Sequence, residues 1–449
     1  MSCRPTRNAA FADEAHDGDG TGAYPVLRQS FVLASDYIEE RSPTGLPRSV
    51  NPKLCNVSAS VVMGTLPRRD HFATFDTNLF VSGQVTCFFR RLRTGMGQTR
   101  TVIIDELRVP IVLAPMAGGP STPELTVAVT EAGGFGILAA GYLSATEVAA
   151  RIAATRAATD AAFGVNLFVP GPATPPARFA DYLAEIGADH ELGASRYDTD
   201  DWEAELDLLT ESPVAVVTCT FGCPTRAEIA RLHAVGSEVW VTVTSVAEAL
   251  IAVDAGADVL IAQGAEAGGH RATFTDRVTD DAVDPLGLLA LLQLLDAAVD
   301  LPIVATGGIT TGAGIAAALA AGSAAVQLGT VFLRCPEAGT NPVHRAAVGT
   351  SEPTMLTRAF TGRRARGVRN RFMVEHSANA PVAYPEIHYA TAPLRARARA
   401  AGNRDDANLW AGQTQALTPE LPAGDLVRTL AADTKTALDK ALSRRIQSC

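Results

Sequence analysis

The feature that most constrains the fold is a regular alternation of short apolar runs and longer alanine-rich segments, which begins near residue 102. The apolar runs are rich in β-branched residues and predict strands, whereas the alanine-rich segments predict helices. Continuously apolar strands are typical of parallel sheets, because helices cover both faces of such a sheet. The candidate strands are residues 111–114, 136–138, 164–167, 215–218, 239–243, 259–262, 303–305 and 325–328.

Eight strand–helix units of this kind close most simply into a (β/α)8 TIM barrel, with a doubly wound open sheet as the alternative. Helix-start signals agree with the predicted helices. Pro123 stands near the start of the segment 122–132, where its missing N–H costs nothing. Ser144 with Glu147, and Ser245 with Glu248, have the spacing of capping boxes. We therefore expect an α/β protein built on a barrel.

Two segments are longer than simple connections between strands. Residues 170–211 begin with several prolines, and residues 336–400 follow the last strand. Long insertions at the carboxyl ends of strands are usually lids or substrate walls. The second insertion holds a basic run at 361–370, which forms either part of such a wall or a solvated surface.

The first 95 residues differ from the rest, because their apolar pattern is weak and glycine, aspartate and proline are frequent in short stretches. We expect a largely disordered N-terminal extension there. Residues 96–449 then form the barrel domain, which includes the insertion at about 336–400 on the substrate side.

Composition excludes several classes of protein. The net charge of −10 argues against a general nucleic-acid binder, and no apolar run is long and pure enough to span a bilayer. Seven unpatterned cysteines favour a reducing, cytoplasmic location over a disulfide framework. No metal site is expected, because Cys219 and Cys223 have no second cysteine pair nearby and His270 has no neighbouring ligand.

The run 263–271 follows the sixth predicted strand, and strand ends are where chemistry occurs in α/β proteins. It combines Gln263, the glycine pair Gly268 and Gly269, and His270. Glycines let the backbone approach a ligand closely, and an imidazole normally titrates near neutrality. The alternative is a tight loop that carries a surface histidine.

Glycine turns also follow the seventh and eighth strands, at 306–308 and 329–330. In a barrel these two loops commonly bind a phosphate, and a helix beginning near Thr311 would add its positive end. The alternative is that the glycines only form tight turns. Polar side chains at other strand ends suit the uncharged edges of a flavin, although spacing alone leaves other phosphate-bearing cofactors open. These side chains are Asn166, Thr218, Thr242, Gln263 and Gln327.

Residues 102–430 resemble the nitronate monooxygenases, formerly called 2-nitropropane dioxygenases. The matching stretches are residues 110–119, 133–136, 165–168, 262–271, 305–309, 327–330 and 409–413. The resemblance implies an FMN-binding barrel whose glycine turns hold the phosphate. The expected cofactor-binding residues are Pro115, Met116, Ala117, Asn166, Thr242, Gln263, Gly268, Gly269, Thr306, Gly307, Gly308, Gln327, Gly329 and Thr330.

The reaction that the resemblance implies is oxidation of alkyl nitronates by O₂ to a carbonyl compound and nitrite. His270 matches the histidine that is proposed in the family as the base for neutral nitroalkanes. Two alternatives stay open. FMN-dependent enoyl-acyl carrier protein reductases share the barrel and a similar Gly-Gly-His stretch but use NAD(P)H, and a flavin-binding protein without catalytic activity is the third possibility. The expected partner is a small molecule together with O₂.

Overall fold

The computed structural model describes residues 102–278 and 284–444, all of which belong to a unit spanning Cys87–Cys449. The extension predicted at residues 1–95 lies outside the described residues. An eight-stranded sheet has the order β1-β9-β8-β6-β5-β4-β3-β2, and all of its strand pairs are parallel. Its strands are β1 (Ile111–Leu113), β2 (Ile137–Ala139), β3 (Gly164–Phe168), β4 (Val216–Thr220), β5 (Glu238–Val243), β6 (Val259–Gln263), β8 (Ile303–Thr306) and β9 (Ala325–Leu328).

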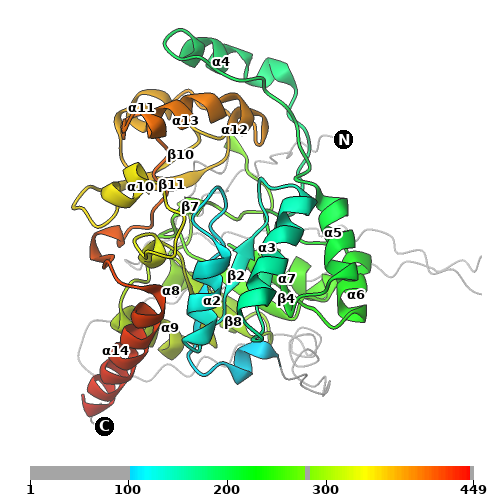
Figure 1. Ribbon diagram of the computed structural model, residues 1–449, viewed down its shortest axis with the longest axis vertical. Helices are drawn as coiled ribbons and strands as arrows, with labels where there is room; N and C mark the ends of the chain where they lie inside the picture. The colour runs from blue at the N-terminus through cyan, green and yellow to red at the C-terminus, as the bar shows by residue number, and fades with distance from the viewer. Residues whose placement is uncertain (1–101, 279–283, 445–449) are drawn as a thin grey trace, which may run out of the picture. The chain divides into compact units, whose positions relative to one another are not determined.

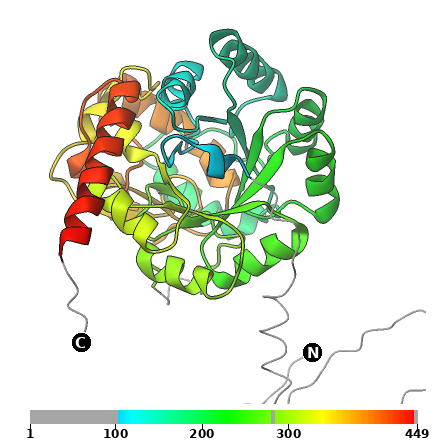
Figure 2. The same ribbon diagram turned by 90° about the horizontal axis from the view of Figure 1, so that it is seen from below.

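The sheet closes on itself. A parallel bridge joins Val112 of β1 to Phe135, just before β2, so that the two edge strands meet. Helices surround the strands (Figure 1), and the ring that they form is seen in Figure 2. The predicted (β/α)8 TIM barrel is therefore confirmed, and the open doubly wound sheet is wrong. The surrounding helices are α2 (Pro123–Glu131), α3 (Ala145–Ala158), α5 (Trp202–Glu211), α6 (Arg226–Ala234), α7 (Val246–Ala255), α8 (Leu288–Asp296), α9 (Gly312–Ala320) and α14 (Ala423–Ser443).

Hydrophobic side chains fill the barrel from within and also pack its strands against the helices. Trp240 of β5 is fully buried and contacts Phe135, with 5.6 Å between the ring centroids. A larger cluster joins the outward faces of the strands to the apolar faces of the helices. Continuous burial of β5 and β6 on both faces accounts for the uninterrupted apolar runs in the sequence.

The helix starts follow the predicted signals with one exception. Pro123 is the first residue of α2, and Ser144 and Glu147 form a complete capping box before α3. Ser245 accepts a hydrogen bond from the backbone N–H of Glu248, as predicted for α7. The second half of that predicted box is wrong, because the Glu248 carboxylate accepts from the N–H and hydroxyl of Thr244 instead.

A three-stranded antiparallel sheet lies outside the barrel, with the order β10 (Thr354–Thr357), β11 (Ala365–Val368) and β7 (Gly269–His270). Its two longer strands come from the insertion at 336–400, whereas β7 comes from the loop that follows β6. Figure 1 shows this sheet and the helices of the insertion gathered on one side of the barrel. Those helices are α10 (Pro342–Ala347), α11 (Arg371–His376), α12 (Glu386–Ala390) and α13 (Ala392–Ala400).

The basic run at 361–370 is not a solvated surface. Arg363 and Arg366 are buried, and the guanidinium of Arg363 lies 4.1 Å from the centroid of the Phe221 ring. Arg363 also donates hydrogen bonds to the backbone oxygens of Arg271 and Thr273. The run therefore ties the insertion to the loop after β6. Within 102–278 and 284–444, no helix is both long and apolar enough to cross a membrane.

Candidate active site

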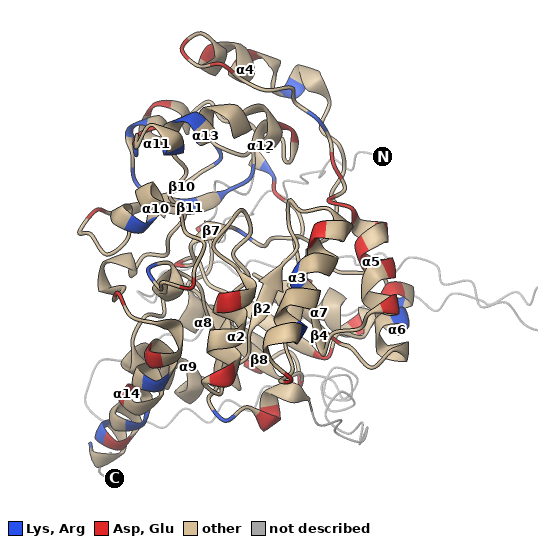
Figure 3. Ribbon diagram, viewed as in Figure 1, with Lys and Arg blue, Asp and Glu red and all other residues tan. Residues whose placement is uncertain are grey.

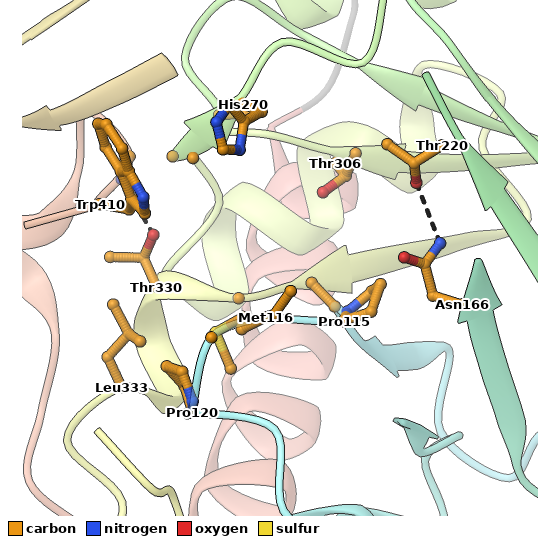
Figure 4. Close-up of a pocket in the computed structure, with 18 of the residues that line it drawn as sticks. Pro115, Met116, Pro120, Asn166, Thr220, His270, Thr306, Thr330, Leu333 and Trp410 are labelled. Atoms are coloured by element: carbon orange, nitrogen blue, oxygen red, sulfur yellow. Dashed lines mark hydrogen bonds between the residues drawn. The ribbon is translucent and has the colours of Figure 1, made fainter. Parts of the chain in front are cut away.

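A cavity of about 440 Å³ opens at the carboxyl ends of the barrel strands. Its volume lies within the range of about 300–1,000 Å³ that is usual for ligand sites. Each barrel strand contributes to the lining through its own end or through the loop that follows it. Figure 4 shows part of this wall, with Met116 and Pro115 opposite His270. All the sequence-predicted site residues line it, namely Pro115, Met116, Ala117, Asn166, Thr242, Gln263, Gly268, Gly269, His270, Thr306, Gly307, Gly308, Gln327, Gly329 and Thr330.

The glycine turns after β8 and β9 are closely packed against the chain. Gly307 and Gly308 have φ values of 120° and 66°, a region that favours glycine. A Cβ added to Gly308 would lie 2.7 Å from the Cβ of Glu266. Thr311 caps the next helix, α9, by accepting a hydrogen bond from the N–H of Gly314. These turns therefore present backbone and a helix N-terminus to the cavity, with no side chain on the glycines.

Gln263, at the end of β6, holds the loop that carries His270. Its Nε2 donates to the backbone oxygen of His270 at 3.0 Å, and its Oε1 accepts from the N–H of Ala272 at 2.9 Å. Both ends of the side-chain amide are thus engaged by the protein itself. The geometry gives Gln263 a positioning role in addition to any contact with a ligand.

Two other amides remain available to a ligand. Asn166 donates through Nδ2 to the hydroxyls of Thr218 and Thr220, at 2.9 and 3.0 Å, so that the amide is fixed across β3 and β4. Gln327 lies on β9, and its buried Nε2 has no hydrogen-bond partner among the described residues. A buried donor without a partner is costly, and a bound molecule with an acceptor would remove that cost.

His270 is held rigidly at the cavity wall. It lies on β7, opposite Ala365 of β11, and its Nε2 is 3.0 Å from the hydroxyl oxygen of Thr361. Three aromatic rings from distant parts of the chain surround the imidazole, and their centroids lie 5.5–5.7 Å from its own. They are Phe221, Tyr384 and Trp410.

The expectation that this imidazole titrates near neutrality is wrong for the structure. Burial, together with the positive charges of the nearby Arg363 and Arg395, lowers the pKa of His270 to about 3. Desolvation disfavours the charged form, and two guanidinium groups oppose a third positive charge. His270 is therefore neutral throughout the physiological range, and one of its ring nitrogens is an acceptor.

Several residues on the wall were not found from the sequence. Tyr142 and His388 line the cavity, and their rings stack with 4.0 Å between centroids. Tyr384, which lines a neighbouring pocket, donates through its hydroxyl to that of Tyr142 at 3.1 Å. Arg395 and His344 also line the cavity. All except Tyr142 belong to the insertion, whose length and position were the one available signal. Among the residues that the structure describes, no His, Cys, Asp or Glu cluster is arranged to bind a metal.

Comparison with known proteins identifies the family. Residues 100–433 match the family model described as nitronate monooxygenase. The chain belongs to the nitronate monooxygenase family. A nitronate monooxygenase from Pseudomonas aeruginosa is 43% identical over 339 residues, which cover 72% of this chain and 95% of the relative. A probable nitronate monooxygenase from Bacillus subtilis is 34% identical over 334 residues, with coverage of 72% and 95%.

Solved structures agree with this assignment. Nitroalkane oxidase from Streptomyces ansochromogenes has a TM-score of 0.73 and 45% identity, and the match covers 76% of this chain and 99% of that one. FabK from Thermotoga maritima is more distant, with a TM-score of 0.60 and 26% identity over 76% and 97% of the two chains. The predicted family is confirmed. This member is an oxidoreductase of a family that oxidises nitronates, and the reductase alternative is not favoured.

Proposed function

We propose that this nitronate monooxygenase uses FMN and O₂ to convert alkyl nitronates into a carbonyl compound and nitrite. The observation that carries the proposal is the convergence, in one cavity, of the glycine turns after β8 and β9 with His270. These turns would hold the phosphate through backbone N–H groups, at Gly307, Gly308, Gly329 and Thr330. We also propose a cytoplasmic location, which the seven unpatterned cysteines favour.

The residues present fit FMN. A phosphate needs clustered N–H donors without side chains in the way, and Gly308 packs so closely on Glu266 that a Cβ has no room. A flavin ring has polar edges, and the free Nε2 of Gln327 and the fixed amide of Asn166 suit them. Pro115 and Met116 lie on the wall opposite His270 (Figure 4), and Ala117 also lines the cavity. When bound, FMN supplies the electron transfer from the nitronate to O₂.

The protein's own contribution is to place the substrate and exclude water. The aromatic rings around His270 shield the reacting carbon, and the Thr361 hydroxyl fixes the imidazole plane. Proton transfer from a nitroalkane to the neutral imidazole produces a nitronate anion and an imidazolium side by side. Attraction between these two charges stabilises the products of the transfer and so offsets the low pKa of the free imidazole. A nitronate substrate is already deprotonated, so His270 then acts as a hydrogen-bond partner.

An absorbance spectrum of the purified protein, followed by oxygen uptake and nitrite measurement with butyl-1-nitronate, tests the proposal. We expect a flavin spectrum, FMN in the released cofactor, and equal rates of oxygen consumption and nitrite formation when side reactions of peroxide are suppressed. NAD(P)H consumption with a crotonyl thioester, without nitronate oxidation, would instead select the reductase. Protein without flavin that does not bind added FMN would contradict the cofactor assignment.

The role of His270 is tested with His270→Asn. We expect FMN to stay bound, turnover of neutral nitroethane to fall by about 10²–10⁴-fold, and oxidation of ethyl nitronate to fall less. His376 on α11 lies outside the cavity and contacts Glu185, so His376→Asn is the matched control. Equal losses on the nitroalkane and on its nitronate would refute the base assignment.

A further inference from the structure

Thr361 lies behind the imidazole of His270 and outside the cavity. It is 1% exposed and does not line the cavity, whereas His270 does. The Thr361 hydroxyl oxygen lies 3.0 Å from Nε2 of His270. Nε2 is therefore turned toward the insertion and away from the cavity. Any effect of Thr361 on a substrate must pass through the imidazole.

The backbone around Thr361 holds this hydroxyl in place. The N–H groups of Thr361 and Gly362 both donate to the backbone oxygen of Arg358, at 3.1 and 2.8 Å, and close a tight turn. Gly362 has a φ of 76°, and a Cβ added to it would overlap the backbone oxygen of Ala383. An ion pair with Asp276 anchors the turn, with 2.7 Å between Nη2 of Arg358 and Oδ1. Basic residues beside β11 are blue in Figure 3. The turn thus fixes the hydroxyl before any substrate binds.

The hydroxyl of Thr361 has one proton and two possible acceptors. One is Nε2 of His270, and the other is the backbone oxygen of Arg363 at 3.2 Å. Among the described residues, that backbone oxygen has no other hydrogen-bond donor. Arg363 is buried, and a buried carbonyl without a donor is costly. The Thr361 proton therefore goes to Arg363, which leaves the hydroxyl oxygen to accept an N–H from Nε2.

The other ring nitrogen, Nδ1, is then the hydrogen-bond acceptor. A neutral imidazole carries its proton on one nitrogen, and hydrogen bonding at the ring decides which one. Nδ1 has no hydrogen-bond partner within the part of the chain that the structure describes, and it is not one of the polar atoms sealed inside that part without a partner. The ring lines the cavity (Figure 4) and Nε2 points away from it, so Nδ1 is the atom that meets a ligand.

We propose that Thr361 is a positioning residue that holds His270 in the Nε2–H tautomer, so that Nδ1 receives the proton of a neutral nitroalkane. This inference rests on the proposed function and deepens it. In the transfer, the C–H bond breaks, its electron pair moves toward the nitro group to form the nitronate, and Nδ1 gains the proton. The ring is then an imidazolium, and its Nε2–H makes a charge-assisted hydrogen bond to the Thr361 hydroxyl.

The opposite tautomer could not perform this step. Nδ1 would already carry a proton, and the acceptor Nε2 would face Thr361 instead of the cavity. A nitronate substrate makes a smaller demand on the tautomer, because it brings no proton to be removed. Its oxygens are acceptors, so Nδ1 donates to them only from a protonated ring.

The tautomer can be read from ¹⁵N magnetic resonance of purified protein labelled at histidine, because protonated and unprotonated ring nitrogens have well separated shifts. The His270 signals are those that disappear in His270→Asn. At neutral pH we expect a protonated Nε2 and an unprotonated Nδ1 in the wild-type protein. A proton on Nδ1 would overturn the inference, whether or not any variant of Thr361 folds.

Thr361→Val tests the consequence for the reaction, since valine has a similar shape and no oxygen. We expect kcat for neutral nitroethane to fall by about 10- to 100-fold with little change in KM, and oxidation of ethyl nitronate to fall by less than about threefold. Thr361→Ser restores the hydroxyl and should recover most of the nitroethane rate. Equal losses on both substrates, or no loss on nitroethane, would overturn the positioning role.

Thr155→Val is the matched control. Thr155 on α3 is fully buried, lies outside the cavity, and donates through its hydroxyl to the backbone oxygen of Arg151 at 2.9 Å. The variant makes the same chemical change at a similar depth and should leave both rates unchanged. A loss on nitroethane as large as that of Thr361→Val would mean that any lost buried hydroxyl slows the enzyme, and would overturn the inference.

The inference and the proposed function fail in different ways. A wild-type protein that oxidises neither nitroethane nor ethyl nitronate contradicts the proposed function, and the inference with it. Oxidation of ethyl nitronate together with a proton on Nδ1 leaves the proposed function standing and overturns only the role of Thr361.

Discussion

Replacing Gly268 by alanine should show how closely the loop after β6 is packed against the segment that follows Trp410. A Cβ on Gly268 would lie 2.5 Å from the backbone carbon of Ala411 and from the nitrogen of Gly412. The contacted atoms are backbone and do not move aside easily. The N–H of Gly412 donates to the Thr330 hydroxyl at 3.0 Å and fixes that backbone.

The expected cost follows from these contacts. Overpacking costs about 1–3 kcal/mol, and loss of a hydrogen bond such as that of Gly412 adds about 0.5–1.5 kcal/mol. We therefore expect Gly268→Ala to lower the free energy of unfolding by about 2–4 kcal/mol and to weaken binding of the proposed FMN, because Gly412 and Thr330 both line the cavity.

Gly269 provides the comparison. It has a φ of 74°, but no atom lies within 4 Å of an added Cβ, so Gly269→Ala should cost only the backbone strain of about 1–2 kcal/mol. Urea unfolding gives both free energies, and flavin fluorescence on dilution gives cofactor release. If Gly268→Ala is no more destabilising than Gly269→Ala, the close approach of Gly268 to the backbone of Ala411 and Gly412 is contradicted.

Three further predictions concern buried ionisable side chains. Burial raises the pKa of Glu205 to about 9, so between about pH 4.5 and 9 the folded state holds a proton that the unfolded state releases. The free energy of unfolding should then fall by about 1.4 kcal/mol per pH unit as pH rises, and urea unfolding at pH 6 and 8 should show this slope vanish in Glu205→Gln. Burial lowers the pKa of His344 to about 4. The free energy of unfolding should therefore fall as the pH drops from about 6.5 to 4, because in this range the unfolded state binds a proton and the folded state does not. His344→Gln should flatten that acid slope in circular-dichroism melts, and an unchanged slope would assign it to other groups. Asp276→Asn should lower the free energy of unfolding in urea by about 3–5 kcal/mol, because it removes a buried negative charge that lies 2.7 Å from Arg358 and 3.4 Å from Arg364, and a cost below about 1 kcal/mol would contradict a stabilising buried pair.

The barrel and the lining of the cavity followed from local patterns in the sequence. A few neighbouring residues set each of these patterns: the strand and helix periods, proline at a helix start and glycine after a strand. Closure of the barrel then brings the strand ends together. Gly307 and Gly329 are 22 positions apart, yet both were assigned to one site because their strands are neighbours in any such barrel.

The surroundings of His270 did not follow, because they depend on contacts between distant segments. Pairing of β7 with β11 joins His270 to Ala365, and no local pattern encodes it. The pKa of His270 also depends on burial by Phe221, Tyr384 and Trp410, whereas the sequence shows only that a histidine is present. The same holds for the basic run at 361–370. Its composition is that of a solvated segment, but its Arg363 is buried against Phe221.

The pairing of β7 with β11 couples the position of the insertion to the position of the His270 imidazole. His270 is part of the ladder that attaches the insertion to the barrel, through the pairings His270–Ala365 and Gly269–Arg366. Any movement that lifts the insertion to admit a substrate must either break this ladder or carry the imidazole away with it. A substrate that needed the insertion to lift would therefore meet the complete site only after this pairing had formed again.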